Sequence, residues 1–386
     1  MSYAGQQTIL DADSHVMELG DFLDDYLSED DRKLLNRGMF DALRGTLDKA
    51  TANAKSRQED AEFRRQAEER VMLDKGWMAM GGWDPAERSR VLDLLGFDAQ
   101  LVFGTFGTLL YKGKSSVDMY VGTSAFNRAI ADFCAHDPRL LAVANIPTKD
   151  PKKATVAATE AIEAGCAAVM IPSLPAGDLA PTHPDLDPFW DVLAESDTPF
   201  VLHVGGGGKL LDRAYHNNNM PVSDHLGGGE NIRSKDYLAI HHSPELFLGA
   251  LILDGLFDRF PKLRGGCIEQ GAGWVVSWLH HLDGAVRSFS RTEEPLQRLA
   301  MKPSEYVRKH LKFTPFPGEP VGWMMQQAGA ELFLFSSDYP HPEGTRDPLG
   351  KFEATLDGVS DADRAKFYSA NFAELIGSRL GAANAG

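Results

Sequence analysis

Eight short runs rich in β-branched and aromatic residues recur along the 386-residue chain, and most are separated by stretches with helical periodicity. Alternation of this kind is typical of a mainly parallel sheet with crossover helices. Because eight parallel strands can close on themselves, we expect an α/β fold built as one (β/α)8 TIM barrel over residues 1–380. The expected strands are residues 8–13, 99–104, 140–146, 166–171, 199–204, 263–269, 310–315 and 332–338.

Two segments interrupt this alternation. Residues 28–76 follow the first expected strand and mix acidic and basic residues at helical propensity, which indicates a solvated helical insertion that could still roof a site. Residues 205–240 follow the fifth strand, open on four glycines and predict a long irregular loop of the kind that binds ligands. The Ala- and Gly-rich tail, residues 381–386, is expected to be frayed. Amphipathic helices are expected at residues 117–135, 153–164, 186–195, 244–259 and 361–376.

Charge and composition exclude several classes of partner. The formal net charge of −16 argues against binding to nucleic acid or to an anionic membrane, because phosphate binding requires clustered Lys and Arg. We see neither a leader-like N-terminus nor an apolar run long enough to span a bilayer, so a cytoplasmic location is expected. The three cysteines lie far apart without CxxC spacing, which indicates neither a disulfide framework nor a thiolate zinc site.

Six residues that can bind metal stand at or just beyond the apparent ends of strands: Asp13, His15, His203, His242, Glu269 and Asp338. Strand alternation turns residues i and i+2 to the same face, so the first pair can bind one ion together. The active site of a (β/α)8 barrel lies where the carboxyl ends of its strands converge. We therefore expect these side chains to meet around a zinc, manganese or iron ion.

The remaining roles follow from position. Asp338 would complete the metal shell or transfer a proton beside it, whereas Glu269 could be a ligand, a general base or an acceptor that orients a histidine. His242 is favoured over the adjacent His241 because it directly precedes a helix start. We expect His341 to hold a carboxylate or carbonyl of a small-molecule substrate, and we assign an apolar substrate wall to Trp83, Phe106 and Trp274.

Several motifs together resemble a known family. They are DADSH at residues 11–15, DPRL at 137–140, residues 165–172, VLH at 201–203, FPKL at 260–263, GAGW at 271–274 and SDYP at 337–340. In combination they are similar to the amidohydrolase-related proteins of the amidohydrolase superfamily, in the branch that includes aminocarboxymuconate-semialdehyde decarboxylase and the resorcylate-type decarboxylases. The resemblance spans nearly the whole chain.

The resemblance implies a distorted (β/α)8 barrel that binds one divalent metal, most often zinc, through Asp13, His15, His203 and Asp338. It also implies a homo-oligomer, a dimer or larger, or a complex with a related barrel. The chain departs from the decarboxylases in two places. Its first-strand pair is Asp-X-His rather than His-X-His or Glu-X-His, and Glu269 stands where those enzymes carry a catalytic histidine.

Three functions stay open at this point. The leading hypothesis is a metal-dependent hydrolase or decarboxylase acting on a small carboxylate or carbonyl compound, through a metal-activated water or a metal-anchored substrate. The two departures also suit a dinuclear non-haem iron or manganese oxygenase, in which His242 and Glu269 would bind the second ion. The third hypothesis is a non-catalytic partner subunit of a related enzyme.

Overall fold

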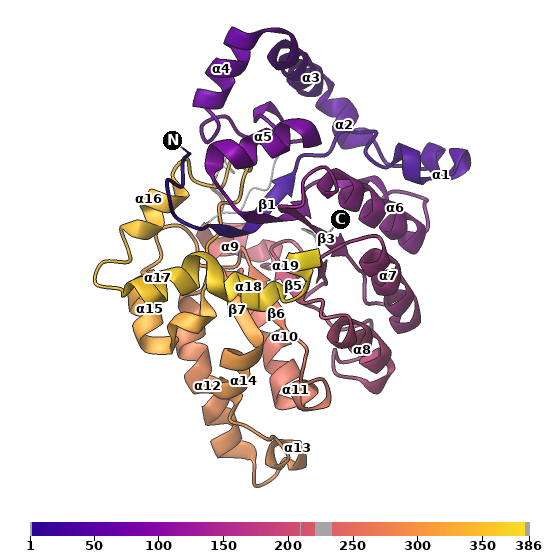
Figure 1. Cartoon of the computed structure of the whole chain (residues 1–386). Coiled ribbons are helices and arrows are strands. Elements are labelled where there is room, and N and C mark those ends of the chain that lie inside the picture. Colours follow the sequence, from indigo (N-terminus) through magenta and orange to yellow (C-terminus); the bar gives the residue numbers. More distant parts are fainter. Residues whose placement is uncertain (1, 209, 221–233, 383–386) are drawn as a thin grey trace.

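A curled parallel sheet forms the centre of the molecule in the computed structural model, which describes residues 2–208, 210–220 and 234–382 (Figure 1). Seven strands follow one another in chain order, each hydrogen-bonded to the next. They are β1 (Leu10–Val16), β2 (Ala99–Gly104), β3 (Leu140–Asn145), β4 (Ala168–Met170), β5 (Phe200–His203), β6 (Gly265–Ile268) and β7 (Leu311–Phe313). Each overlaps an expected strand, so the parallel α/β architecture is confirmed.

The eighth expected strand, residues 332–338, differs from the expectation because it is not a regular strand. Isolated parallel bridges connect Phe333 to Phe313 of β7 and Tyr339 to Ser14 of β1. The ladder is irregular here because the backbone N–H of Ser337 donates to a buried side chain, the carboxylate of Asp11, at 2.8 Å. The segment thus lies between β7 and β1 without extending the sheet as an eighth strand.

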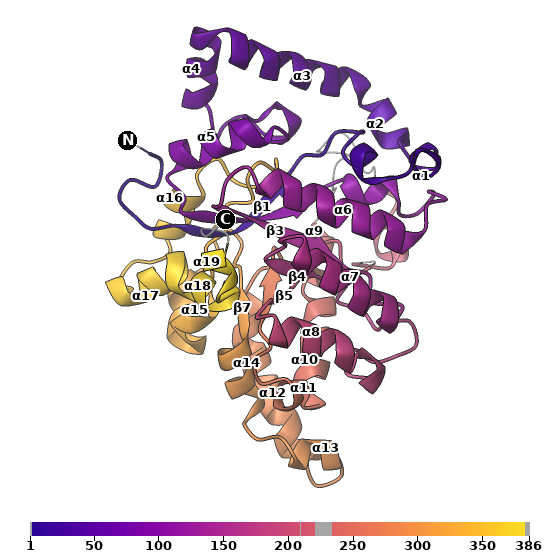
Figure 2. The ribbon, with the colours of Figure 1, turned by 45° about the vertical axis from the view of Figure 1, so that its right-hand side comes forward.

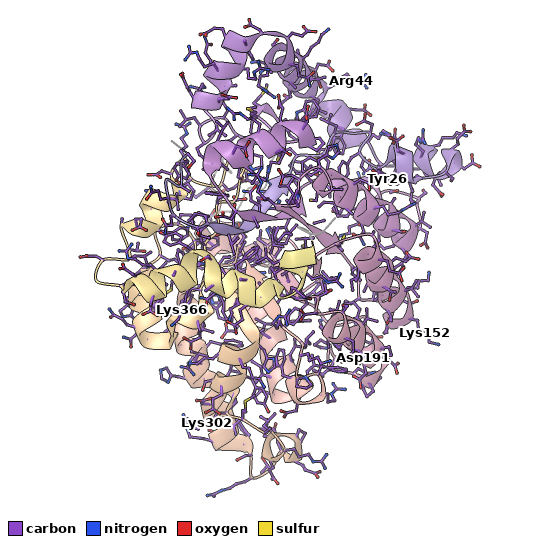
Figure 3. All side chains as sticks on the ribbon, in the orientation of Figure 1. Tyr26, Arg44, Lys152, Asp191, Lys302 and Lys366 are labelled. Carbon is purple, nitrogen blue, oxygen red and sulfur yellow. The ribbon has the colours of Figure 1, made fainter. Side chains whose placement is uncertain are left out.

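Helices cover the outside of the sheet (Figures 1 and 2). The larger ones are α5 (Pro85–Leu95), α6 (Met119–Cys134), α7 (Pro151–Glu163), α8 (Asp187–Glu195), α10 (His242–Leu253), α12 (Gly273–Phe289), α14 (Pro303–His310) and α15 (Val321–Ala328). Shorter ones are α9 (Ser234–Ala239), α11 (Leu256–Arg259), α13 (Glu294–Gln297), α16 (Pro348–Glu353), α17 (Asp361–Ala365), α18 (Asn371–Ile376) and α19 (Arg379–Ala382). Charged side chains such as Arg44, Lys152 and Lys302 lie at the periphery (Figure 3).

Two of the five expected helices are interrupted. The expected helix 244–259 is divided into α10 and α11 by Gly255, whose φ of +72° is a left-handed conformation that ends a helix at little steric cost to glycine. The expected helix 361–376 contains a π-helical turn, Lys366–Ala370, between α17 and α18. Each interruption divides one expected helix into shorter elements.

The insertion after β1 contains four helices: α1 (Glu29–Lys33), α2 (Gly38–Ala42), α3 (Arg44–Glu59) and α4 (Ala61–Glu69). Both views show α3 and α4 at the edge of the molecule, beyond α5. Neither α1 nor α4 buries a residue, whereas α2 buries Phe40 and α3 buries Ala50, Ala54 and Arg57. The insertion is attached through Arg57 of α3, whose guanidinium makes a bidentate, nearly fully buried ion pair with Glu87 of α5 at 2.7 and 2.8 Å.

The expected insertion 205–240 lies partly outside the described residues. Its described part holds a short 3-10 turn, Arg213–His216, and α9. The tail 383–386 likewise lies outside them. Among the helices of the described residues, none combines the length and apolarity needed to cross a bilayer.

Candidate metal centre

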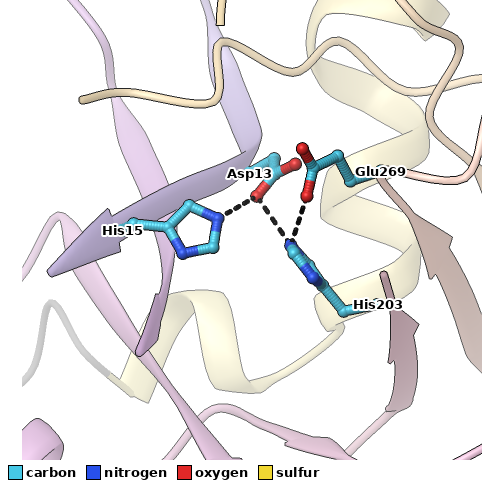
Figure 4. A group of neighbouring side chains, drawn as sticks. All are labelled: Asp13, His15, His203 and Glu269. Carbon is cyan, nitrogen blue, oxygen red and sulfur yellow. Dashed lines mark hydrogen bonds and ion pairs between the residues drawn. The ribbon is translucent and has the colours of Figure 1, made fainter. Parts of the chain in front are cut away.

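Five of the predicted residues meet at the carboxyl ends of the strands, and Figure 4 draws four of them, Asp13, His15, His203 and Glu269. Asp13 and His15 stand two apart on β1, and His203 is the last residue of β5. Glu269 directly follows β6, and Asp338 ends the irregular segment between β7 and β1. Parallel strands bring these ends together even though the residues are far apart in the chain, as the sequence predicted.

Asp13 is the hub of this cluster. Its Oδ1 lies 3.2 Å from Nε2 of His15 and 3.4 Å from Nε2 of His203. The same His203 nitrogen lies 3.4 Å from Oε2 of Glu269, and Nε2 of His15 lies 3.5 Å from Oδ1 of Asp338. Asp13 and His15 are no more than 2% exposed, so bulk water barely reaches their side chains.

Glu269 and Asp338 both adopt a left-handed backbone conformation, with φ of +52° at each residue. For a residue with a side chain this conformation costs about 1–3 kcal/mol, and such costs concentrate at functional sites. The turn is fixed at Glu269 by a hydrogen bond from its backbone N–H to Oγ1 of Thr314 at 2.8 Å. At both residues the left-handed backbone conformation bends the chain at the residue whose carboxylate lies in the cluster.

The donor atoms of the cluster are poorly satisfied by protein alone. Oδ2 of Asp13, both ring nitrogens of His15 and Oδ1 of Asp338 are buried without a well-aligned hydrogen bond among the described residues. By contrast, Nδ1 of His203 lies 3.0 Å from the carbonyl oxygen of Val204, which places the proton on Nδ1 and leaves the Nε2 lone pair facing Asp13 and Glu269. Buried imidazole and carboxylate atoms in this arrangement fit a divalent metal ion.

The protonation of the cluster favours metal binding. Burial opposes charge on Asp13, but the neighbouring His203 and His15 outweigh it and hold the pKa of its carboxyl well below the usual range. Burial lowers the pKa of His15 to about 4, so its imidazole is neutral at pH 7. Burial lowers the pKa of His203, but the Asp13 carboxylate outweighs this effect and raises it.

His341 forms an ion pair with Asp338 at the cavity floor. Its Nδ1 lies 3.0 Å from Oδ1 of Asp338, its Nε2 lies 2.9 Å from Oγ1 of Thr105, and its ring stacks on His15 at a centroid distance of 3.7 Å. Burial disfavours its charged form, but the Asp338 carboxylate outweighs burial and raises the pKa of His341 to about 9. The pair therefore holds a proton at neutral pH.

A cavity of about 600 Å³ opens above the cluster. His15, His203, Glu269 and His341 lie at its floor, and its wall is mainly apolar. The apolar part includes Phe103, Phe106, Leu109, Met119, Met170 and Leu174, together with Met39 of the insertion. A space of this size suits a small organic molecule.

Three predicted residues do not join the site. His242 is exposed at the start of α10, outside both clusters of possible metal ligands found among the described residues, and its ring packs on His241. Trp274 stacks on His241 and donates to the carbonyl of Gly271, while Trp83 is partly buried elsewhere. Neither tryptophan lines the cavity, whereas Phe106 does.

Asn145 and Lys112 are among the cavity residues that the sequence analysis did not name. Asn145 ends β3 and lines the cavity. It is a polar residue at the end of an apolar run, which is the same sequence signal that identified His203. Lys112, the hydrogen-bond partner of Asn145 at 3.0 Å, follows a 3-10 turn and had no signal in the sequence.

Comparison with known proteins decides the family. A family model described as amidohydrolase matches residues 11–377. The chain belongs to the amidohydrolase family. The predicted family and the class of enzyme, a metal-dependent hydrolase or carbon–carbon lyase, are confirmed.

A curated relative and two solved structures illustrate this membership. The chain is 26% identical over 262 residues to a γ-resorcylate decarboxylase from Rhizobium sp. (strain MTP-10005), covering 65% of this chain and 74% of the relative. An amidohydrolase from Mycobacterium avium subsp. paratuberculosis K-10 superposes with a TM-score of 0.73 at 20% identity, covering 96% of this chain and 100% of that one. A dihydroxybenzoic acid decarboxylase from Polaromonas sp. JS666, with bound manganese and the inhibitor 2-nitroresorcinol, gives a TM-score of 0.62 at 18% identity, covering 97% and 98%.

These relatives bear on the cofactor as well. The Polaromonas decarboxylase contains manganese, and the cluster of this chain offers the kinds of ligand atom that a divalent metal needs, without favouring zinc in particular. The two-metal oxygenase receives no support from the comparisons, and its second ligand pair is not assembled because His242 lies away from Glu269.

Proposed function

We propose that this protein is a mononuclear, metal-dependent decarboxylase of a small aromatic carboxylate. The observation that carries the proposal is the buried cluster of Asp13, His15, His203 and Asp338 beneath an apolar cavity of about 600 Å³. A relative named as a decarboxylase of an aromatic acid belongs to the same family and supports the reaction class. Phe103 and Phe106 on the cavity wall provide surfaces against which an aromatic ring could pack.

Asp13, His15, His203 and Asp338 would hold the metal. A divalent ion bound there supplies positive charge that neutralises and orients the substrate's oxygen atoms. Glu269, 3.4 Å from Nε2 of His203, orients that imidazole and can exchange a proton with it. The carboxylate-rich set suits manganese as well as the zinc expected from the sequence.

The reaction itself needs one proton. The bond between the ring carbon and the carboxylate breaks, its electron pair stays on the carbon, and a proton from the Asp338–His341 pair forms the new C–H bond as CO₂ leaves. The 3.0 Å contact between Oδ1 of Asp338 and Nδ1 of His341 positions that proton beside the cavity floor. Phe103 packs on His203 at a centroid distance of 4.6 Å and keeps this imidazole in place.

We further propose that residues 332–338 complete the barrel as an irregular eighth member, closing one domain over residues 1–380. The backbone bonds from Leu334 to Phe313 at 2.9 Å and from Asp338 to Asp13 at 2.9 Å support closure on both sides. In this arrangement residues 28–76 and the described part of residues 205–240 are insertions.

The test measures labelled CO₂ released from carboxyl-labelled 2,6-dihydroxybenzoate and 5-carboxyvanillate by manganese- and zinc-loaded protein. Asp338→Asn should lower the rate by about a hundredfold or more, because the variant loses a proposed metal ligand and the carboxylate that keeps His341 protonated. The matched control Asp357→Asn changes an exposed acid and should leave the rate unchanged. If the protein hydrolyses esters or amides from a substrate panel but releases no CO₂, the decarboxylase proposal is wrong and the protein is a hydrolase.

A further inference from the structure

Lys112 is the one basic residue, Lys or Arg, among the described residues that line the cavity above the metal centre. It follows the 3-10 turn Gly107–Leu110 and is partly buried. None of the described carboxylates lies within ion-pair distance of its ammonium. It therefore does not neutralise Asp13, Glu269 or Asp338, and its charge remains available to a ligand.

The position of this ammonium is fixed by the protein. Nζ of Lys112 donates to Oδ1 of Asn145 at 3.0 Å. Asn145 is itself held at the end of β3, because its backbone N–H donates to Oδ1 of the buried Asn127 at 2.8 Å and its carbonyl accepts from Nδ2 of Asn127 at 3.4 Å. An ammonium has three N–H donors, and the single bond to Asn145 leaves two that can serve a ligand.

Burying a lysine without a counter-ion is unfavourable. Among the described residues the Lys112 ammonium has the hydrogen bond to Asn145 and a contact with the Tyr111 ring, 5.9 Å from the ring centroid, but no carboxylate partner. Burial lowers the pKa of Lys112 to about 8, so the side chain still carries its charge at neutral pH. A preorganised, partly desolvated cation in a cavity is suited to binding an anion through charge-assisted hydrogen bonds.

We propose that Lys112, positioned by Asn145, binds a second anionic substituent of the substrate, a carboxylate, while the first carboxylate lies at the metal centre. This inference rests on the proposed function, because it requires that the cavity accept an aromatic carboxylate. It assigns the enzyme a preference for dianionic over monoanionic substrates.

The experiment compares two probes, benzoate with one carboxylate and isophthalate with two, by calorimetric titration of manganese-loaded protein. Wild-type protein should bind isophthalate about ten- to a hundredfold more tightly than benzoate, the range of a charge-assisted hydrogen bond. Lys112→Met should remove this preference and leave the affinity for benzoate within about threefold of the wild-type value. Lys114→Met, two residues away and exposed, is the matched control and should keep the preference.

A second variant retains the lysine. Asn145→Asp would place a carboxylate against Nζ of Lys112 and neutralise its charge within the protein. This variant should therefore also abolish the preference for isophthalate. Equal affinity of the wild-type protein for the two probes, or a preference that survives in Lys112→Met, would overturn the role of Lys112 and leave the decarboxylase proposal standing. Failure of both probes to bind any variant would overturn the proposed function and this inference with it.

Discussion

At the scale of single residues, Asp13 organises the centre because one of its oxygen atoms contacts two imidazoles. Replacement of its carboxylate would leave His15 and His203 buried without their shared partner. The two strained residues, Glu269 and Asp338, add carboxylates where a regular strand would direct the chain elsewhere. The site is therefore assembled by buried electrostatics and by backbone geometry together.

The Asp338–His341 pair predicts a pH-dependent stability of the metal-free protein. The folded-state pKa of His341, about 9, exceeds the value of about 6.5 expected in the unfolded chain. The protonated imidazole therefore contributes stability that is fully present below about pH 6.5 and is lost as the pH rises through about 9, up to about 3 kcal/mol. Thermal unfolding across this window should show a falling Tm.

Two histidine variants show whether His341 causes the fall of the Tm with rising pH. His341→Gln should flatten the pH profile of the Tm between about pH 6.5 and 9, whereas His281→Gln, an exposed histidine, should keep it. A profile of His341→Gln identical to that of the wild type would show that this pair does not titrate as described.

Most of the centre could be predicted from the sequence because strand alternation is a local pattern and the carboxyl ends of parallel strands meet on one side of the sheet. These two features bring Asp13, His15, His203, Glu269 and Asp338 together without knowledge of packing. The orientation of His242 could not be predicted, since it depends on where α10 begins and how that helix docks. The inward orientation of Lys112 depends in the same way on a loop conformation.

At the scale of elements, the insertion after β1 is held by few groups. Helix α3 buries only Ala50, Ala54 and Arg57, so the bidentate pair between Arg57 and Glu87 is its main polar attachment. Oε2 of Glu87 also accepts the backbone N–H of Gly81 at 3.0 Å. The carboxylate thus links the insertion to the chain that leads into α5.

Removing one member of this pair should release the insertion. Arg57→Met leaves the Glu87 carboxylate buried without its cation, and we expect a loss of about 3–5 kcal/mol in the free energy of unfolding, with faster proteolysis within α3 and α4. Urea unfolding measures the first effect and limited proteolysis the second. The double variant Arg57→Met/Glu87→Gln should recover part of the loss, and Arg65→Met, in an exposed pair on α4, should leave stability unchanged. An unaltered urea midpoint in Arg57→Met would exclude this attachment.

Seven strands were predictable as short apolar runs, but the irregular backbone of the eighth expected strand was not. Residues 332–338 have the composition of a buried strand, yet the carboxylate of Asp11 accepts both the N–H and the hydroxyl of Ser337, at 2.8 and 2.6 Å. A side chain 326 positions away thus replaces the expected ladder partner. Such competition between side chain and backbone does not show in local sequence patterns.

At the scale of the whole molecule, the metal would connect parts of the chain that are distant in sequence. Its four proposed ligands come from β1, β5 and the segment between β7 and β1. Because a bound ion stabilises only the folded state, its binding free energy adds to the stability of the sheet that carries those ligands.

Metal removal should therefore lower the Tm. At a metal concentration about a thousandfold above Kd, the folded state gains about 4 kcal/mol relative to the metal-free protein. Differential scanning calorimetry with and without chelator measures the shift, which should be absent in Asp13→Asn. A chelator effect of equal size in that variant would place the ion elsewhere.

The most direct test of the account is the metal content of protein purified without added metal, measured by mass spectrometry against protein concentration. We predict about one divalent ion per chain in the wild type and its loss in Asp13→Asn and in His203→Asn, with His242→Asn retaining it. Two ions per chain, or an ion retained after loss of Asp13 or His203, would contradict the single-metal centre.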